Sequence, residues 1–195
     1  MRTVTLCLAF LAVSSLASGQ TAPVASAPPP SAAAKTEEVG VLKTNQGTMV
    51  FRFFEQDAPR TTAHVKKLVR DGFFDGKLFY RVVKGHVIQA GDGEGTAGPK
   101  VKAEFNSHPF VSGTVGLARD ADPDSGSTEI FICHVPRPHL DGKYTAFGLL
   151  IEGQDVLEKI ANVEVEEKYI EKVVFHKPKQ PVVIEKATIE TRAVP

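Results

Sequence analysis

An arginine and a glutamine stand in the stretch FYRVVKGHVIQAGD, which spans residues 79–92. Most of the other residues are apolar and read as a partly buried strand, so Arg81 interrupts a segment that would otherwise face a core. A guanidinium that is buried without a partner is energetically costly. We therefore expect Arg81 on a concave outer face, on the side opposite Tyr80 and Val82, held by a neighbour such as Gln89 on the next strand. Taken alone, these residues fit a structural salt bridge as well as an active site.

The composition favours a globular protein that does not bind a polyanion. The 195 residues include 23 Lys and Arg and 23 Asp and Glu, so the formal net charge is zero. The basic residues are spread along the chain without a basic run among aromatics, and we expect no nucleic-acid partner. A hydrophobic content of 42% supports one globular domain and excludes disorder over most of the chain.

The N-terminus has the pattern of a secretory signal peptide. Arg2 precedes an apolar run, and small residues follow it, which predicts a signal peptide over residues 1–19 with cleavage after Gly19. An uncleaved membrane anchor is the alternative. Residues 20–38 are rich in Ala, Pro and Ser and are typical of a disordered linker, so we place the folded domain at residues 39–193. We expect an exported protein, periplasmic or extracellular, with no membrane span after signal removal.

Removal of the signal would leave Cys133 as the only cysteine, because Cys7 lies in the apolar run. A single cysteine excludes an internal disulfide framework. Cys133 lies in the strand-like run EIFICHV, where a buried small hydrophobic residue is a simpler interpretation than a nucleophile.

Many short strands and two helices must position these residues. A helix is expected within residues 58–72, with Thr61 or Thr62 as its N-cap, and a second helix within residues 152–163. Strands are expected at 39–54 as a hairpin, and then at 79–83, 87–90, 101–105, 114–118, 130–135, 145–150 and 180–192. In the last strand, regular alternation would place Val183, Glu185, Ala187 and Ile189 on one face. This pattern favours a β-barrel or sandwich whose open ends are covered by helices.

Several further motifs follow in order: GEGTAGP, EF at Glu104 and Phe105, SGTVGLAR, EIFIC and HLDGKYTAFG, with APRTTAHVKKLVRDGFFDG upstream. Together with FYRVVKGHVIQAGD, this series resembles the cyclophilin family of peptidyl-prolyl cis-trans isomerases over residues 39–192. The resemblance implies a mainly β fold, a closed eight-stranded antiparallel β-barrel capped by two α-helices. It also implies that the protein binds proline-containing peptide segments of client proteins.

Such an enzyme accelerates rotation about an X-Pro bond, whose barrier of roughly 18–20 kcal/mol reflects amide resonance. At the twisted state the proline nitrogen gains a lone pair, and a fixed donor aimed at that nitrogen stabilises only the transition state. Arginine remains protonated and offers several N–H donors. We expect neither a metal nor a cofactor. The spacing of His86, His134 and His139 fits no standard zinc site.

The resemblance assigns a role to individual positions. Arg81 matches the catalytic arginine of the family, and Gln89 matches the glutamine that orients it. The positions that match substrate-binding residues are Phe131, Leu140, Tyr144, His86, Val87, Glu129, Ala118, Gly95 and His139.

Four of these positions depart from the family pattern. His86 replaces a usual Phe and Val87 a usual Met, which thins the apolar wall of the pocket. Glu129 replaces a usual Gln and could draw Arg81 into an ion pair. His139 replaces a Trp, which implies weak binding of cyclosporin. These departures imply lowered or altered turnover.

Two functions remain open on the sequence. The first is an exported prolyl isomerase that assists the folding of other exported proteins. The second is a peptide-binding chaperone or interaction module with little or no turnover. In either case we expect a monomer.

Overall fold

A computed structural model of the chain describes residues 35–93, 98–170 and 173–193. The predicted signal peptide and all of the predicted linker up to residue 34 lie outside these residues. The first strand begins at Thr36, three residues before the predicted start of the domain at Val39. Within the described residues, no helix is both long enough and apolar enough to cross a membrane.

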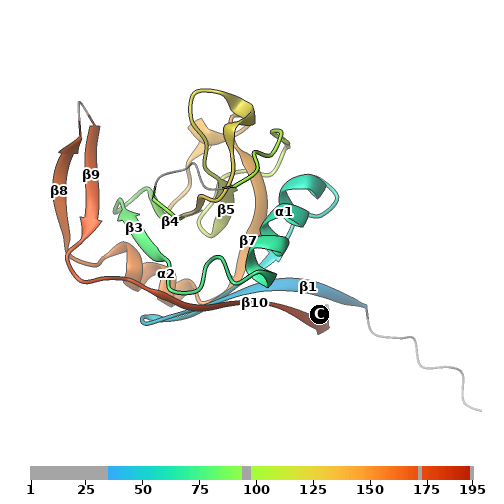
Figure 1. Cartoon of the computed structure of the whole chain (residues 1–195), viewed down its shortest axis with the longest axis horizontal. Helices are drawn as coiled ribbons and strands as arrows, with labels where there is room; N and C mark the ends of the chain where they lie inside the picture. The colour runs from blue at the N-terminus through green and yellow to red at the C-terminus, as the bar shows by residue number, and fades with distance from the viewer. Residues whose placement is uncertain (1–34, 94–97, 171–172, 194–195) are drawn as a thin grey trace, which may run out of the picture. The chain divides into compact units, whose positions relative to one another are not determined.

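The described residues form a mainly antiparallel β structure with two α-helices, as predicted (Figure 1). Eight strands form one sheet in the order β10-β1-β2-β7-β5-β6-β4-β3. Their bounds are β1 Thr36–Thr44, β2 Gly47–Phe53, β3 Leu78–Val82, β4 Val87–Gly91, β5 Thr114–Leu117, β6 Ile130–Cys133, β7 Thr145–Glu152 and β10 Ile184–Ala193. Helix α1 spans Pro59–Arg70 and α2 spans Gln154–Ala161, and short 3-10 helices lie at Pro123–Ser125 and Pro138–Leu140.

The sheet curls until its two edge strands meet, but the closure is less complete than a closed barrel implies. Leu78 at the start of β3 forms a single antiparallel bridge with Val183, just before β10. The Phe79 amide donates to the Val182 carbonyl at 2.9 Å, and the Ile184 amide donates to the Lys77 carbonyl at 2.8 Å. These few bonds pair the backbone groups at the seam, where the two edge strands meet.

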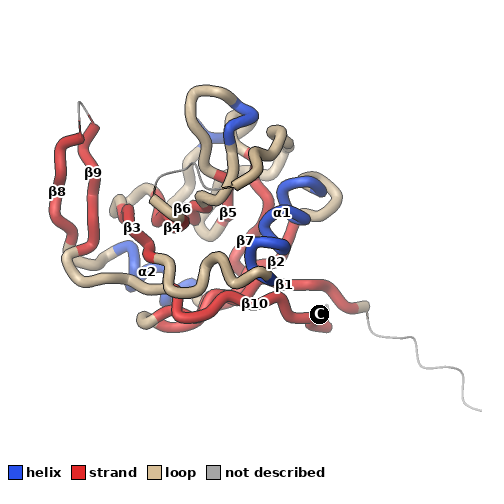
Figure 2. The backbone as a smooth tube through the Cα atoms, in the orientation of Figure 1, coloured by secondary structure: helices blue, strands red, loops and turns tan. Residues whose placement is uncertain are grey.

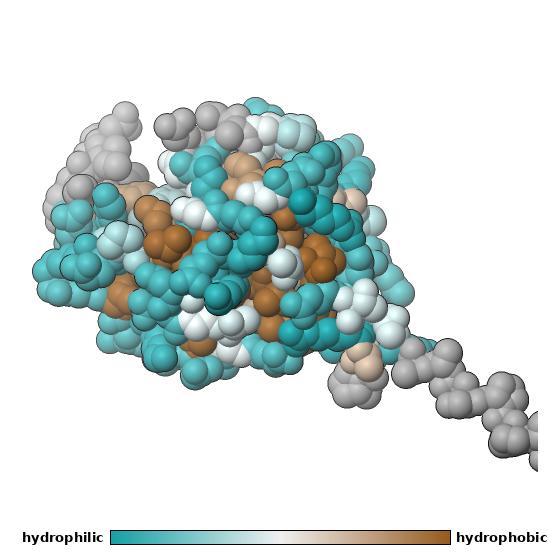
Figure 3. Space-filling view, turned by 60° about the horizontal axis from the view of Figure 1, so that its bottom comes forward, coloured by the Kyte–Doolittle hydropathy of each residue, from teal (hydrophilic) through white to brown (hydrophobic). Residues whose placement is uncertain are grey.

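Apolar side chains inside the curled sheet form the core. Phe51, Phe79 and Phe147 are each at most 1% exposed, and burial of rings of this size is a dominant stabilising contribution. The buried residues of the two helices belong to the same cluster: Val65 and Val69 from α1, and Leu157 and Ile160 from α2. On the face drawn in Figure 3, hydrophilic side chains cover most of the surface and apolar residues appear in separate patches.

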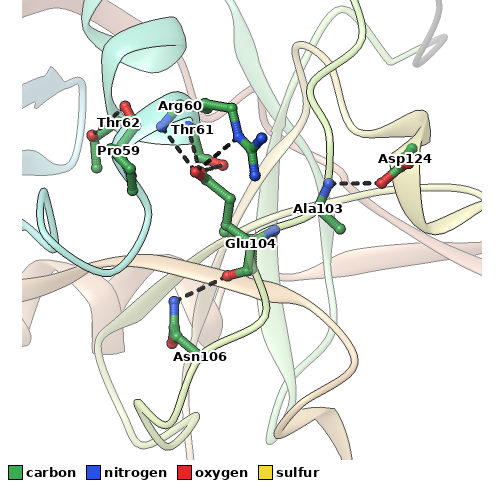
Figure 4. A network of polar contacts seen from close by, with 9 residues as sticks. Pro59, Arg60, Thr61, Thr62, Ala103, Glu104, Asn106 and Asp124 are labelled. Atoms are coloured by element: carbon green, nitrogen blue, oxygen red, sulfur yellow. Dashed lines mark hydrogen bonds and ion pairs between the residues drawn. The ribbon is translucent and has the colours of Figure 1, made fainter.

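The N-terminus of α1 is capped from a distant loop, and the predicted caps Thr61 and Thr62 are wrong. The helix begins at Pro59, after Ala58, which has no polar side chain. The buried Glu104 carboxylate instead accepts from the amides of Arg60 at 3.0 Å and Thr61 at 2.7 Å, and from the Thr61 hydroxyl at 2.8 Å (Figure 4). Burial opposes ionisation of Glu104, but the bonds from Thr61 and Arg60 prevail and its pKa is lowered.

The strand predicted at residues 101–105 does not form, although the structure describes this whole segment. Only Val101 makes a bridge, with Gly126. The amide of Ala103 donates to the Asp124 carboxylate, and the amide of Glu104 donates to the Thr145 hydroxyl. Because side chains take these donors, they are not available for a strand ladder.

A hairpin that the sequence reading missed lies between α2 and β10. Its strands are β8, Val165–Ile170, and β9, Val173–Pro178, and they form a separate two-stranded sheet. Figures 1 and 2 show the hairpin beside β3. The Phe175 ring of β9 stacks on Tyr80 of β3 with centroids 5.8 Å apart.

The face alternation predicted for the last strand is also wrong at its start. Ile184 and Ala187 are both buried, at 0% and 2% exposure. The pairing of β1 with β10 shifts register between Lys43 and Thr44. Such a bulge adds one residue to the alternation of β10. Ile184 and Ala187 therefore face the same side although three positions separate them.

Candidate active site

One row of paired residues crosses the sheet and carries the expected arginine. Arg81 of β3 pairs with Gln89 of β4, Gln89 with Phe131 of β6, and Phe131 with Gly116 of β5. Directly paired residues of an antiparallel sheet face the same side. The register therefore brings the guanidinium, the amide and the aromatic ring together, although they come from three separate segments.

A β-bulge in β3 changes the face of Tyr80. Leu78 pairs with Gly91 and Arg81 pairs with Gln89, so Phe79 and Tyr80 together lie opposite one residue, Ala90. Phe79 and Val82 are both 1% exposed and face the core, whereas Tyr80 and Arg81 are both half-buried on the outer side. The expectation that Tyr80 and Arg81 point to opposite sides is wrong, because a bulge adds a residue to the alternation.

Arg81 is held by the neighbour that the sequence suggested. Its Nη1 donates to Gln89 Oε1 at 3.2 Å. Burial lowers the pKa of Arg81, and an arginine remains protonated at neutral pH even so. The guanidinium thus lies beside a cavity with its charge intact and with donors left for a ligand.

A cavity of about 140 Å³, lined by both apolar and polar side chains, lies next to Arg81. Phe131 lies in its wall and is fixed from two sides, stacked on Phe110 at 5.6 Å and edge-on to Tyr144 at 5.7 Å between ring centroids. Gly116 makes room for this ring, since a Cβ there would lie 2.4 Å from Phe131 Cζ. The lining residues are Arg81, His86, Val87, Gln89, Ala118, Arg119, Phe131, Leu140 and Tyr144.

The cavity contains a neutral histidine in place of the apolar residue that the family pattern has there. Burial, helped by the charges of Arg137, Arg81 and His139, lowers the pKa of His86 to about 4. Its Nδ1 is buried and has no hydrogen-bond partner among the described residues. His139 stacks on His86 with centroids 5.8 Å apart, but it is exposed and does not line the cavity.

Glu129 does not form the ion pair with Arg81 that the sequence suggested, although the structure describes both side chains. Its Oε2 accepts from the Tyr80 hydroxyl at 2.5 Å, and its Oε1 accepts from the Gly93 amide at 2.8 Å. Burial and the neighbouring Asp92 raise the pKa of Glu129, and the bonds from Tyr80 and Gly93 oppose them. Glu129 lines a second, polar cavity of about 190 Å³, which shares Gln89, Ala118 and Arg119 with the first.

Two residues of the site were not predicted. The Arg119 guanidinium lies 4.6 Å from the Tyr144 ring centroid, and its Nε and Nη2 donate to the Lys143 carbonyl. This fixes Tyr144 on the cavity wall. Tyr80 is the second, and no sequence signal could place it here, because the bulge depends on pairing with β4.

The predicted substrate-binding residue Gly95 lies outside the described residues.

Cys133 is not among the residues that line the cavity. Cys133 is buried, as predicted, and burial raises the pKa of its thiol to about 12, so it stays protonated. In the part of the chain that the structure describes, no three His, Cys, Asp or Glu side chains gather as metal ligands.

A protonated guanidinium beside a small cavity with aromatic and aliphatic side chains in its wall, on a curled antiparallel sheet, is suited to stabilising a twisted prolyl amide. The fold and the site thus define a class of protein, the prolyl isomerases that need no nucleophile. The sequence profile of the family "Cyclophilin type peptidyl-prolyl cis-trans isomerase/CLD" matches residues 40–189. The chain belongs to this cyclophilin family, and it is a peptidyl-prolyl cis-trans isomerase.

Individual relatives agree with this assignment. A peptidyl-prolyl cis-trans isomerase of Synechococcus elongatus is 46% identical over 112 residues, which are 55% of this chain and 77% of the relative. A probable peptidyl-prolyl cis-trans isomerase of Brucella abortus is 37% identical over 144 residues, 66% of this chain and 74% of the relative. A cyclophilin type isomerase of Cryptosporidium parvum, crystallised in the presence of the dipeptide Ala-Pro, superposes with a TM-score of 0.70 at 25% identity. That match covers 78% of this chain and 98% of the other.

Proposed function

We propose that this isomerase acts on X-Pro bonds of exported proteins, with Arg81 as the group that stabilises the transition state. The single observation that carries the role of Arg81 is its position, held by Gln89 and lining the same cavity as Phe131. A donor at this place can meet the proline nitrogen only when the amide has twisted and its lone pair is free. An acceleration of about 10⁴-fold requires roughly 5.5 kcal/mol of such selective stabilisation.

The cavity beside Arg81 is the proposed site for the pyrrolidine ring. Phe131, Leu140 and Tyr144 give it an apolar wall, and Val87 and Ala118 complete that wall beside His86. The Cryptosporidium relative was crystallised in the presence of a proline dipeptide, which supports proline-containing segments as the ligand here. The ring would be held in the cavity while the carbonyl before the proline rotates. The proline nitrogen would then stay beside Arg81 during the rotation.

A peptide assay tests the role of Arg81. Isomerisation of X-Pro peptides is followed by protease coupling with the wild type, Arg81→Ala and the control Arg192→Ala, which removes a partly exposed guanidinium on β10. We expect Arg81→Ala to lose about 10²-fold or more in kcat/KM, the usual effect of removing a transition-state donor, and Arg192→Ala to match the wild type. A wild type that binds the peptide without accelerating its isomerisation would instead support a peptide-binding module.

Export is proposed from the N-terminal pattern of Arg2, an apolar run and small residues up to Gly19. The test is fractionation of cells that express the full chain, with N-terminal sequencing of the product. We expect the mature chain outside the cytoplasm and beginning at Gln20. A cytoplasmic product that retains Met1 would contradict export. It would not bear on the assignment of the chain as an isomerase.

A further inference from the structure

Four side chains form a hydrogen-bonded series that ends at Arg81. The Tyr80 hydroxyl donates to Glu129 Oε2 at 2.5 Å, and Gln89 Nε2 donates to the Tyr80 oxygen at 2.6 Å. Arg81 Nη1 then donates to Gln89 Oε1 at 3.2 Å. Every bond in the series therefore runs in one direction, from the guanidinium towards the carboxylate.

This direction matters because the two ends of a glutamine amide differ in chemistry and are nearly equal in shape. The oxygen accepts and the nitrogen donates, and an arginine can use only the oxygen. If the amide turned over, its NH₂ group would face the guanidinium, and two donors would oppose each other. The orientation of the Gln89 amide thus decides whether it can hold Arg81 at all.

The Glu129 carboxylate sets the orientation of that amide through Tyr80. A carboxylate can only accept, so it engages the single hydrogen of the Tyr80 hydroxyl. With that hydrogen engaged, the Tyr80 oxygen is left as an acceptor, and Gln89 must turn its nitrogen towards it. Burial and the bond to Glu129 raise the pKa of Tyr80, which keeps the hydroxyl protonated and able to donate.

The Tyr80 ring is itself held between two segments. On one side it stacks on Phe175 of the β8–β9 hairpin, with an angle of 8° between the ring planes. Gly93 lies close by, since a Cβ there would approach Tyr80 Cγ to 3.8 Å. The Gly93 amide also donates to Glu129 Oε1, so the ring, the hydroxyl and the carboxylate are fixed together.

We propose that Glu129 and Tyr80 are positioning residues, which fix the direction of the Gln89 amide so that its oxygen faces Arg81. This inference rests on the proposed role of Arg81. The sequence suggested that Glu129 would draw Arg81 into an ion pair and so hinder it. In this proposal Glu129 instead helps to hold Arg81 in place. The hairpin contributes by holding the Tyr80 ring through Phe175.

Two conservative substitutions test the proposal in the full chain. Tyr80→Phe keeps the ring and removes the hydroxyl. Glu129→Gln keeps the shape, but its amide can donate as well as accept. The Tyr80 hydroxyl could then accept from the new amide rather than donate to it, and its direction would no longer be fixed. We expect each variant to lose about five- to tenfold in kcat, the size of one hydrogen bond, with KM within about twofold. The control Glu185→Gln, at an exposed ion pair with Lys43, should match the wild type.

The double variant separates a shared mechanism from independent damage. If both side chains act through the one Gln89 amide, the double variant should be no slower than the slower single variant. Multiplied losses in the double variant would overturn the proposal. So would a rate that rises in Glu129→Gln, or a rise in KM with unchanged kcat.

An NMR measurement keeps the test independent of turnover. The side-chain ¹H–¹⁵N signals of Gln89 and the Nε–H signal of Arg81 report the orientation of the two groups. We expect both sets to shift or broaden in Tyr80→Phe and Glu129→Gln, and to stay in place in Glu185→Gln. An inactive wild type would contradict the proposed role of Arg81. If the wild type is active but the signals of the two variants match its own, the positioning role alone is contradicted.

Discussion

Tyr80 and Arg81 are neighbours in the sequence and bind opposite ends of the same amide. Tyr80 accepts from the Gln89 nitrogen at 2.6 Å, and Arg81 donates to the Gln89 oxygen at 3.2 Å. A regular strand would separate two adjacent side chains onto opposite faces. The bulge in β3 places both on the outer face, where each can act on the same site.

The first prediction concerns the geometry of the guanidinium. Arg81→Lys keeps a positive charge but replaces a planar fork with a compact ammonium on a flexible stem. We expect kcat/KM for an X-Pro peptide to fall at least about tenfold, or ~1.4 kcal/mol in transition-state stabilisation. The melting temperature should stay near that of the wild type. A lysine variant with full activity would mean that charge alone is sufficient.

The second prediction concerns the cavity wall. His86→Phe removes a buried nitrogen that has no partner among the described residues and adds apolar surface beside Phe131. We expect KM for the peptide to fall by about three- to tenfold, because the phenyl ring offers the proline ring more apolar contact surface than imidazole does. His139→Phe, at an exposed position outside the cavity, serves as a comparison. An equal fall in both variants would count against a specific role of the cavity.

The third prediction follows from the pKa of His86, which is lowered from 6.5 to about 4. As pH falls below 6.5, the unfolded chain takes up this proton before the folded chain does, so unfolding becomes easier. The contribution to stability is therefore present above about pH 6.5 and is lost as pH falls towards about 4. Urea unfolding at about pH 7 and about pH 5 should show a smaller loss of stability in His86→Phe than in the wild type. Equal losses would show that another group governs this pH range.

The fourth prediction uses a glycine beside the cavity. In Gly116→Ala the new Cβ would lie 2.4 Å from Phe131 Cζ and 2.9 Å from Phe110 Cε1, so the Phe131 ring must move. We expect a loss of roughly 1–3 kcal/mol in the free energy of unfolding, as for other overpacked sites, and reduced kcat/KM. Gly40→Ala makes a similar clash with Phe51, 2.3 Å away in the core. It should lose stability but keep the activity of its folded fraction.

The fifth prediction concerns the distant cap of α1. Glu104→Gln leaves one amide oxygen to serve the donors of Arg60 and Thr61, and its NH₂ group opposes them. We expect the free energy of unfolding to fall by about 1–3 kcal/mol, measured by urea denaturation, because buried donors lose their acceptor. Glu185→Gln removes an exposed ion pair and should change stability by less than about 0.5 kcal/mol. A similar small effect at Glu104 would contradict its role as the cap.

The order of the motifs in the sequence was sufficient to predict the family, the antiparallel fold with two helices, and the pairing of Arg81 with Gln89. The strands and helices depend on local patterns that each carries within itself, and Arg81 and Gln89 lie on two strands that follow each other in the chain. The strand β2 within the hairpin predicted at 39–54 and the helix α1 within residues 58–72 are examples, and both formed as expected.

Tertiary structure alone decided the features that depend on register. The bulges beside Tyr80 and Thr44, the cap that Glu104 supplies to α1, and the stacking of Phe175 on Tyr80 all join residues that only the folded sheet brings together. A bulge is selected by the pairing of two whole strands, and a donor in a loop goes to whichever acceptor the packing places nearest. The residue types of a single segment therefore predict that Arg81 needs a partner, while the arrangement of neighbouring strands determines how that partner is held.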